Sequence, residues 1–246
     1  MTDSKPVSAK LVLEDGSVFE GTSFGFQAST SGEVVFNTGM VGYYESLTDP
    51  SYAGQILACT YPLIGNYGVP EEKKKELSSF FESHKIHAQG LVVSDYSYNF
   101  NHFEAKKSLS QWLVEEKIPA ITGIDTRTLT KKLRENGTML GKIIVNNEDT
   151  ELFDPNSHNI VEKVSTKKEI VYGEKNSGPK IMLMDCGVKN NIIRSLVNRN
   201  CVVTRVPFDF DFFAKGIEFD RVVVSNGPGD PKQCTQTISI IKKVLQ

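Results

Sequence analysis

Residues 180–206 read KIMLMDCGVKNNIIRSLVNRNCVVTRV, and residues 221–230 read RVVVSNGPGD. Short apolar runs rich in β-branched residues alternate here with one helical repeat, and glycine or asparagine punctuates each change. The pattern predicts three strands, over Lys180–Met184, Val202–Val206 and Arg221–Ser225, with helices over about Lys189–Asn198 and Gln233–Leu245. Strands alternating with helices in this way are typical of βαβ units with a parallel sheet. The fold class predicted for this half is therefore α/β.

The first half of the chain has a different order of predicted strands and helices. Strands are predicted over Leu11–Leu13, Ser17–Glu20, Glu33–Asn37, Gln55–Tyr61, Gly90–Ser94 and Leu140–Val145. Asp15-Gly16 between the first two strands predicts a hairpin. Helical spacing over Glu104–Glu116, and again from a cap at Asp125 to Gly137, adds two helices. This part reads as α+β.

Apolar periodicity weakens between the two halves, where Asn, Asp, Lys, Ser and Pro accumulate. We interpret residues 1–150 as a first domain, 151–179 as a linker and 180–246 as a second domain. Three strands with two helices leave an apolar sheet edge that α/β domains normally cover. The second domain is therefore expected to be incomplete.

Composition excludes several classes of protein. The 246 residues are 39% hydrophobic and carry 28 basic against 30 acidic side chains, with a formal net charge of -2. This balance offers no general attraction to nucleic acid or to an anionic membrane. No apolar run spans a bilayer and no signal peptide is evident, so we expect a cytoplasmic protein. The mixed-sign run at residues 71–76 predicts a solvated helix face.

Cysteine and histidine do not form a recognisable catalytic or metal-binding pattern. The four cysteines lack CxxC spacing, which disfavours zinc or a disulfide framework. Cys186 follows a predicted strand, where nucleophiles are common, but no histidine occurs after His158 to activate it. We therefore interpret the cysteines as small apolar core or loop residues. His84, His87 and His102 lack HxxxH or HExxH spacing and are interpreted as solvated or packed side chains.

The segment SNGPGDP, residues 225–231, joins a predicted strand to a predicted helix. Its glycines can bring backbone N–H groups to the carboxyl edge of the sheet, where α/β proteins bind ligands. A tight turn that needs glycine for its geometry explains the sequence equally well. The segment does not match a phosphate-binding loop. Ser51 follows a proline turn in TDPSY, where serine usually bonds its own backbone, and its role stays open on this ground alone.

Several long strings nevertheless point to one family when taken in order. LVLEDGSVFEG, GEVVFNTGMVGYYESLTDPSYAGQIL, TYPLIGNYGVP, GIDTRTLTKKLRENGTMLG, MDCGVKNNIIRSLV and VSNGPGDP together cover nearly the whole chain. The sequence resembles the small (glutaminase) subunit of carbamoyl phosphate synthetase, above all the amino-terminal part of the multifunctional eukaryotic proteins that start pyrimidine synthesis.

The resemblance implies a specific architecture and chemistry. It implies an N-terminal β/β/α domain that docks on the synthetase, followed by a class I glutamine amidotransferase domain of flavodoxin-like type. Glutamine would be the substrate, contacted by Ser51, Gly227 and Gly229, with the Gly227 N–H as an oxyanion donor. ATP and magnesium are expected only in the synthetase partner, which is the large subunit or the equivalent domains. No cofactor is expected in this chain.

One departure from the family qualifies these expectations. Class I amidotransferases carry a G-x-C-x-G-x-Q nucleophile elbow one strand after NGPGDP, with the histidine and glutamate partners further on. The sequence stops at Gln246, before that strand, so we expect no catalytic residues in this chain and no activity from it alone. Two other interpretations stay open: a non-catalytic docking fragment that binds the synthetase, and a nucleotide-binding α/β protein, which the missing phosphate motif disfavours.

Overall fold

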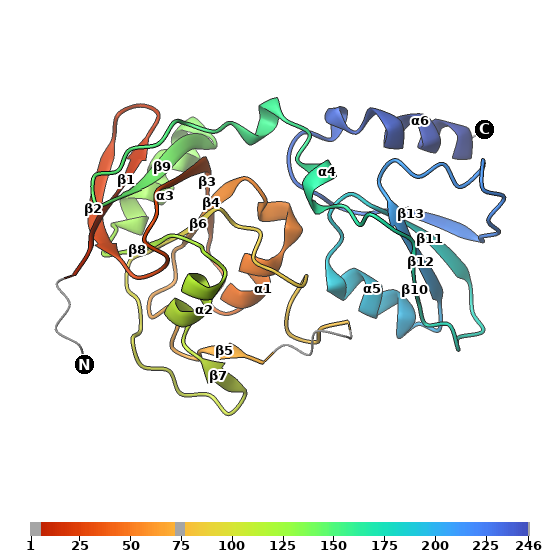
Figure 1. Cartoon of the computed structure of the whole chain (residues 1–246), viewed down its shortest axis with the longest axis horizontal. Coiled ribbons are helices and arrows are strands. Elements are labelled where there is room, and N and C mark those ends of the chain that lie inside the picture. Colours follow the sequence, from red (N-terminus) through yellow and green to blue (C-terminus); the bar gives the residue numbers. More distant parts are fainter. Residues whose placement is uncertain (1–5, 72–76, 246) are drawn as a thin grey trace.

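The computed structural model describes residues 6–71 and 77–245 and shows two sheet-based bodies joined by an extended segment (Figure 1). Most of the charged run at residues 71–76 lies outside the described residues. The prediction of a helix face there is therefore left open. The mixed α/β class predicted from the sequence is confirmed.

Seven strands of the first body close into a barrel in the order β1-β2-β8-β6-β4-β3-β9. Their bounds are β1 Ser8–Leu13, β2 Val18–Ser23, β3 Thr30–Asn37, β4 Gln55–Cys59, β6 Gly90–Val93, β8 Ala120–Thr122 and β9 Met139–Val145. Alternate residues of β1 are buried, as one-sided strands require, and the predicted hairpin forms with Leu11 opposite Phe19. Closure into a barrel was not anticipated from the sequence, because no local pattern reports which distant strands pair.

Helices cover the barrel and form two apolar clusters with it. They are α1 Tyr43–Thr48, α2 Leu109–Glu115 and α3 Thr126–Asn136. The α3 helix begins as predicted, with the Asp125 carboxylate accepting a hydrogen bond from the Thr128 N–H at 2.9 Å, and Gly137 follows its last residue. Leu129 and Leu133 of α3 pack into the barrel core. The position of α1 was missed, because six residues are too few to show a helical repeat.

The helix predicted over Glu104–Glu116 is too long at its start. Residues Ala105–Lys107 form strand β7, which pairs with β5 Val69–Pro70. The helix begins after Ser108, whose hydroxyl accepts a hydrogen bond from the Gln111 N–H at 3.1 Å. The Ser108 cap and the pairing of β7 with β5 together explain why the weak helical pattern over residues 104–107 does not form a helix.

The second body is a four-stranded sheet in the order β10-β12-β11-β13. Its elements are β10 Ile170–Tyr172, β11 Lys180–Asp185, α5 Asn190–Val197, β12 Val202–Pro207, β13 Arg221–Val224 and α6 Thr235–Val244. The strand β11 is parallel to both β12 and β13, as the βαβ pattern predicted. The helices α5 and α6 cover opposite faces (Figure 1). Leu183 accordingly packs in the α5 cluster and Met184 in the α6 cluster.

The prediction of three strands in this sheet is wrong, because the segment interpreted as a linker contributes a fourth. The strand β10 pairs antiparallel with β12 at that edge. Ile-Val-Tyr is a good strand sequence, but three residues between charged neighbours gave too little signal. The same segment holds the short helix α4 Val161–Val164, which lies between the two bodies in Figure 1.

The short 3₁₀ helices each follow an aspartate and begin with proline. They are η1 Pro50–Tyr52, η2 Pro155–Ser157 and η3 Pro231–Gln233. In each one the aspartate side chain accepts a hydrogen bond from a backbone N–H two residues later. The local sequence Asp-Pro-x therefore determines these turns directly.

Candidate functional site

The structure brings Ser51 and the glycine turn together from opposite halves of the chain. The Asn226 side-chain amide donates a hydrogen bond to the Ser51 hydroxyl oxygen at 2.7 Å. The Ser51 side chain therefore reaches across to the second body instead of bonding its own backbone. The local turn is stabilised by Asp49, whose carboxylate accepts the Ser51 N–H at 3.0 Å. Asn226 was not singled out from the sequence, although it lies directly beside Gly227.

Gly227 is held against the end of strand β11 more closely than any side chain allows. A Cβ atom built at Gly227 would lie 1.8 Å from the carbonyl oxygen of Cys186. Gly229 has a φ of 73°, a left-handed conformation that favours glycine. The glycines of SNGPGDP are thus required by the geometry of the turn, and this packing places the turn at the carboxyl edge of the sheet.

The neighbouring turn, after β11, is organised by a fully buried carboxylate. Asp185 accepts hydrogen bonds from the N–H groups of Gly187 and Val188, at 2.9 and 2.8 Å. Its other oxygen receives the Thr166 N–H at 2.6 Å and pairs with the Arg205 guanidinium, also at 2.6 Å. A buried charge is stable only with such partners. Asp185 therefore fixes the backbone on which the glycine turn rests.

An ion pair also joins the two bodies beside Ser51. The Lys189 ammonium lies 2.7 Å from the Asp49 carboxylate, whose side chain is only 7% exposed. Partial burial of Lys189 opposes its charge, but the hydrogen bond and charge of Asp49 outweigh this and raise the lysine pKa. Because Asp49 also caps the turn that carries Ser51, Lys189 helps to hold the serine in place. The sequence contains no local signal that pairs these two residues.

Glu82 makes a second contact between the two bodies, at the start of α5. Lys189 is the N-cap residue but provides no side-chain cap. The Glu82 backbone oxygen accepts the Asn190 N–H, and its carboxylate accepts the Asn191 N–H, both at 2.8 Å. Arg194 lies 3.4 Å from the same carboxylate. A negative group at a helix amino terminus is stabilising, so the first body completes α5.

A cavity of about 560 Å³ opens beside the glycine turn. It lies between α6 and the end of β13, and its lining includes the apolar side chains of Val161, Val224, Ile238 and Ile241. Val224 is 44% exposed on the edge strand. The sequence predicted an uncovered apolar sheet edge, and β13 provides one.

The cysteines are all buried and free. Burial, with a smaller contribution from the nearby Cys234, raises the pKa of Cys186 to about 12. A thiol of that pKa carries almost no thiolate near neutral pH, so Cys186 is unsuited to be a nucleophile. The interpretation of Cys186 as a buried apolar residue is confirmed by its 6% exposure.

Across residues 6–71 and 77–245, no three His, Cys, Asp or Glu side chains are grouped so that they could hold a metal ion. No helix in the same ranges is long and apolar enough to cross a membrane.

Comparison with known proteins assigns the family. Residues 11–143 match the profile described as "Carbamoyl-phosphate synthase small chain, CPSase domain". The chain belongs to the carbamoyl-phosphate synthase small-chain family. Residues 182–246 match a second profile, "Glutamine amidotransferase class-I". The resemblance stated from the sequence motifs is thereby confirmed.

Relatives of this family align along nearly the whole chain. "Multifunctional protein CAD" of Squalus acanthias is 52% identical over 96% of this chain and 11% of its own length. "Carbamoyl-phosphate synthase [ammonia], mitochondrial" of Homo sapiens is 47% identical over 98% of this chain and 16% of its own. "Carbamoyl phosphate synthase arginine-specific small chain" of Phaeosphaeria nodorum is 46% identical, with coverages of 97% and 52%. The chain thus spans between about a tenth and a half of these relatives.

Proposed function

We propose that this chain is the front part of the glutaminase of a glutamine-dependent carbamoyl phosphate synthetase. Glutamine would meet Ser51 from the first body and the Gly227–Gly229 turn from the second. The observation that carries this proposal is the 2.7 Å hydrogen bond from Asn226 to Ser51, which joins residues 175 positions apart at one sheet edge.

The two motifs are suited to different tasks. Backbone N–H groups on a rigid turn can stabilise a developing oxyanion without reorganising, which is the role proposed for the Gly227 N–H. A serine hydroxyl can orient the substrate by one hydrogen bond. We propose that Ser51 binds the ground state and that the turn acts on the transition state. The ammonia released would supply carbamoyl phosphate synthesis, as the first reaction of pyrimidine synthesis.

Kinetics of a synthetase in which this chain is completed with the missing amidotransferase residues separate the two roles. Ser51→Ala is expected chiefly to raise KM for glutamine, by an amount equivalent to one hydrogen bond, about 0.5 to 1.5 kcal/mol. Gly227→Pro deletes the N–H and is expected to lower kcat roughly a hundredfold or more. Because a Cβ at this position also meets the Cys186 carbonyl oxygen, a urea unfolding curve of the variant accompanies the kinetics and shows whether the lost rate comes from a folded protein. Synthesis from free ammonia should survive both changes. Unchanged glutamine kinetics in Ser51→Ala would remove the serine from the site.

This chain by itself is proposed to lack glutaminase turnover. No histidine follows His158, so the second body contains no base for a cysteine nucleophile. Glutamate release by the purified chain tests this directly. Release that disappeared in Cys186→Ser would overturn the proposal and make Cys186 the nucleophile.

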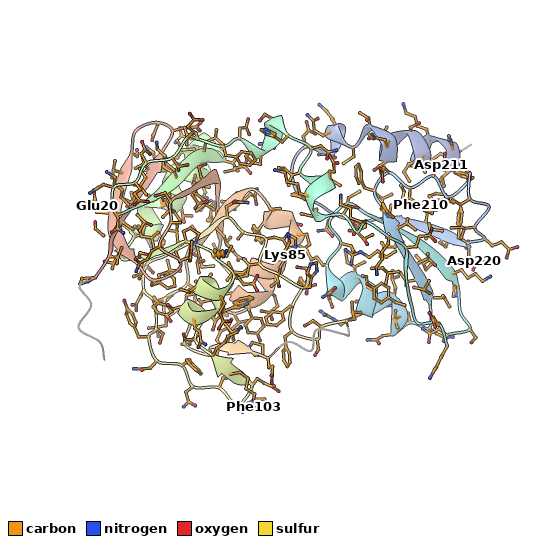
Figure 2. All side chains as sticks on the ribbon, viewed as in Figure 1. Glu20, Lys85, Phe103, Phe210, Asp211 and Asp220 are labelled. Atoms are coloured by element: carbon orange, nitrogen blue, oxygen red, sulfur yellow. The ribbon has the colours of Figure 1, made fainter. Side chains whose placement is uncertain are left out.

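A docking role for the first body is the second candidate, and it rests on an exposed aromatic loop between β6 and β7. Tyr98 is 70% exposed and Phe103 is 84% exposed, and Figure 2 shows Phe103 at the tip of the loop. Such side chains are typical of interfaces. We propose that this loop contacts the synthetase, where ATP and magnesium would bind.

Pull-down by the synthetase portion tests the docking role. Tyr98→Glu and Phe103→Glu should each weaken the complex, whereas Val18→Glu, at a half-exposed position on β2, serves as the matched control. Binding without any effect on glutamine use would favour the docking fragment over the glutaminase. Binding of ATP by this chain alone would favour a nucleotide-binding protein.

A further inference from the structure

A second cavity, of about 490 Å³, lies where the barrel meets the segment that leads to the second sheet. On the barrel side its lining comes from the start of β3 and from Lys85 to Gln89, just before β6. The segment that leads to the second sheet adds Phe153, Ile160 and Lys163 to the lining. The volume falls in the range of small-molecule sites, about 300–1,000 Å³. The glycine turn at Gly227 is not part of this lining.

The lining carries positive charge and hydrogen-bond donors. Lys85 and Lys163 contribute two ammonium groups, and Thr30, Ser31 and Thr150 contribute hydroxyls. Among the described residues that line the cavity, none is an aspartate or a glutamate. A cavity with this balance favours an anion over a cation or a neutral apolar molecule.

His87 supplies a buried polar group to this cavity. The side chain belongs to a residue only 8% exposed. Burial, together with the positive charges of Lys85, His84 and Arg205, lowers the pKa of His87 to about 3, so its ring is neutral at physiological pH. A neutral imidazole offers one N–H donor and one acceptor nitrogen.

The ring of His87 has no hydrogen-bond partner among the residues that the structure describes, and no hydrogen bond contributes to its pKa. Only its backbone is engaged, with the N–H donating to the Leu47 carbonyl oxygen at 2.9 Å. The ring nitrogens are not among the fully buried side-chain atoms without a partner in the described residues, so they are open to the cavity. A ligand in the cavity can provide that partner.

The two lysines approach the cavity from different elements. Lys85 lies on the side of the first body that faces the second, as Figure 2 shows. The Lys163 ammonium lies 5.5 Å from the centre of the Phe153 ring, a cation–π contact that restrains it beside the cavity. Neither lysine forms an ion pair within residues 6–71 and 77–245, so both charges are available to a ligand.

We propose that this cavity binds a small organic anion through a phosphate or carboxylate group, held by Lys85 and Lys163 and oriented by the His87 ring. The volume leaves room for an organic portion beside Phe153 and Ile160. The site is separate from the one proposed for glutamine and does not depend on that proposal.

Equilibrium dialysis of the purified chain against inorganic phosphate tests the site, with acetate as a second arm at matched ionic strength. Saturable binding of one anion per chain is expected, and the arm that binds more tightly identifies the headgroup. The variants Lys85→Gln and Lys163→Gln should each weaken binding about tenfold, since each removes one charge-assisted hydrogen bond. Lys168→Gln changes an exposed lysine outside the lining and is the matched control.

The lysine variants alter only exposed positions and should fold, so a loss of binding can be assigned to the site. His87→Gln keeps a donor and an acceptor at the buried position and is expected to bind better than His87→Leu. Binding that does not saturate, or that all three lysine variants weaken equally, would mean general attraction to positive charge and would overturn the proposal. Failure of both anions to bind at millimolar concentration would overturn it as well.

Discussion

Asp49 and Lys189 provide a direct measure of how firmly the two bodies are joined beside Ser51. The ammonium and carboxylate are 2.7 Å apart, with the lysine side chain 39% exposed and the aspartate 7% exposed. Fully exposed ion pairs contribute about 0.2–1 kcal/mol, whereas removing one partner of a buried pair costs about 3–5 kcal/mol. This pair lies between the two cases. We expect a coupling free energy of about 1–2 kcal/mol.

The two single substitutions should have unequal costs. Asp49→Asn keeps an oxygen that can accept the Ser51 N–H, because asparagine caps turns about as well as aspartate, and the half-exposed Lys189 can turn to water. Lys189→Met leaves the buried Asp49 charge without its cation and should destabilise more, by about 3 kcal/mol. The assay is a double-mutant cycle on the free energy of unfolding in urea.

The pH dependence of the pair provides a second readout. Its charge partner raises the pKa of Lys189 above the ordinary lysine value of 10.5, so the folded state holds the proton more tightly than the unfolded state. The stabilisation is then fully present below about pH 10.5 and is lost as pH rises through the folded pKa. The difference in stability between the wild type and Asp49→Asn should shrink over that alkaline range.

An exposed ion pair elsewhere in the second body provides the control for this cycle. Lys180 and Glu218 form an exposed pair at 3.6 Å, and the cycle of Lys180→Met with Glu218→Gln should give coupling within experimental error. If the Asp49–Lys189 cycle gave the same result, the ion pair would not join the two bodies. Ser51 would then need another source of rigidity.

Three further predictions concern single positions. Gly227→Ala places a methyl group against the Cys186 carbonyl oxygen and should lower the free energy of unfolding by more than about 3 kcal/mol. The control Gly216→Ala meets open space and should cost only about 1 kcal/mol, because residue 216 has a positive φ. Similar urea midpoints for the two variants would contradict the close packing at Gly227. Cys186 should react with iodoacetamide at pH 8 more than tenfold slower than free cysteine, as mass spectrometry of the labelled peptide would show, because its pKa is about 12. Asp125→Ala should lower the free energy of unfolding by about 1 kcal/mol through loss of the α3 cap, and Asp125→Asn should restore most of it; equal loss in both would refute a capping role.

Local chemistry made several elements predictable from the sequence. Asp15-Gly16 specified the first hairpin, and Asp125 with Gly137 specified both ends of α3. The βαβ rhythm after Lys180 specified the parallel strands β11, β12 and β13. In each case the information lies in residues close together in the chain, where turn geometry, capping and periodicity act. The family motifs carried the resemblance in the same way.

Elements that depend on distant partners could not be predicted. The three residues of β10 form a strand because β12 offers an unpaired edge, and Ala105–Lys107 extends because β5 lies beside it. Closure of the barrel likewise depends on pairings between distant strands, such as β1 with β9. Such pairings are decided by which edges and apolar faces remain uncovered in the folded chain, and single short segments do not encode that.

The candidate site shows the same division. The sequence by itself determined that Ser51 follows a proline turn and that residues 225–231 form a glycine turn after a strand, because both conformations follow from local residue types. Only the tertiary structure decided that these turns meet, that Asn226 donates to Ser51, and that Asp49 pairs with Lys189. These contacts connect residues more than a hundred positions apart, and Glu82 adds a further contact between the two bodies at the start of α5. Because the partners are far apart in the sequence, no local pattern can predict these contacts; they form only when the two bodies pack together.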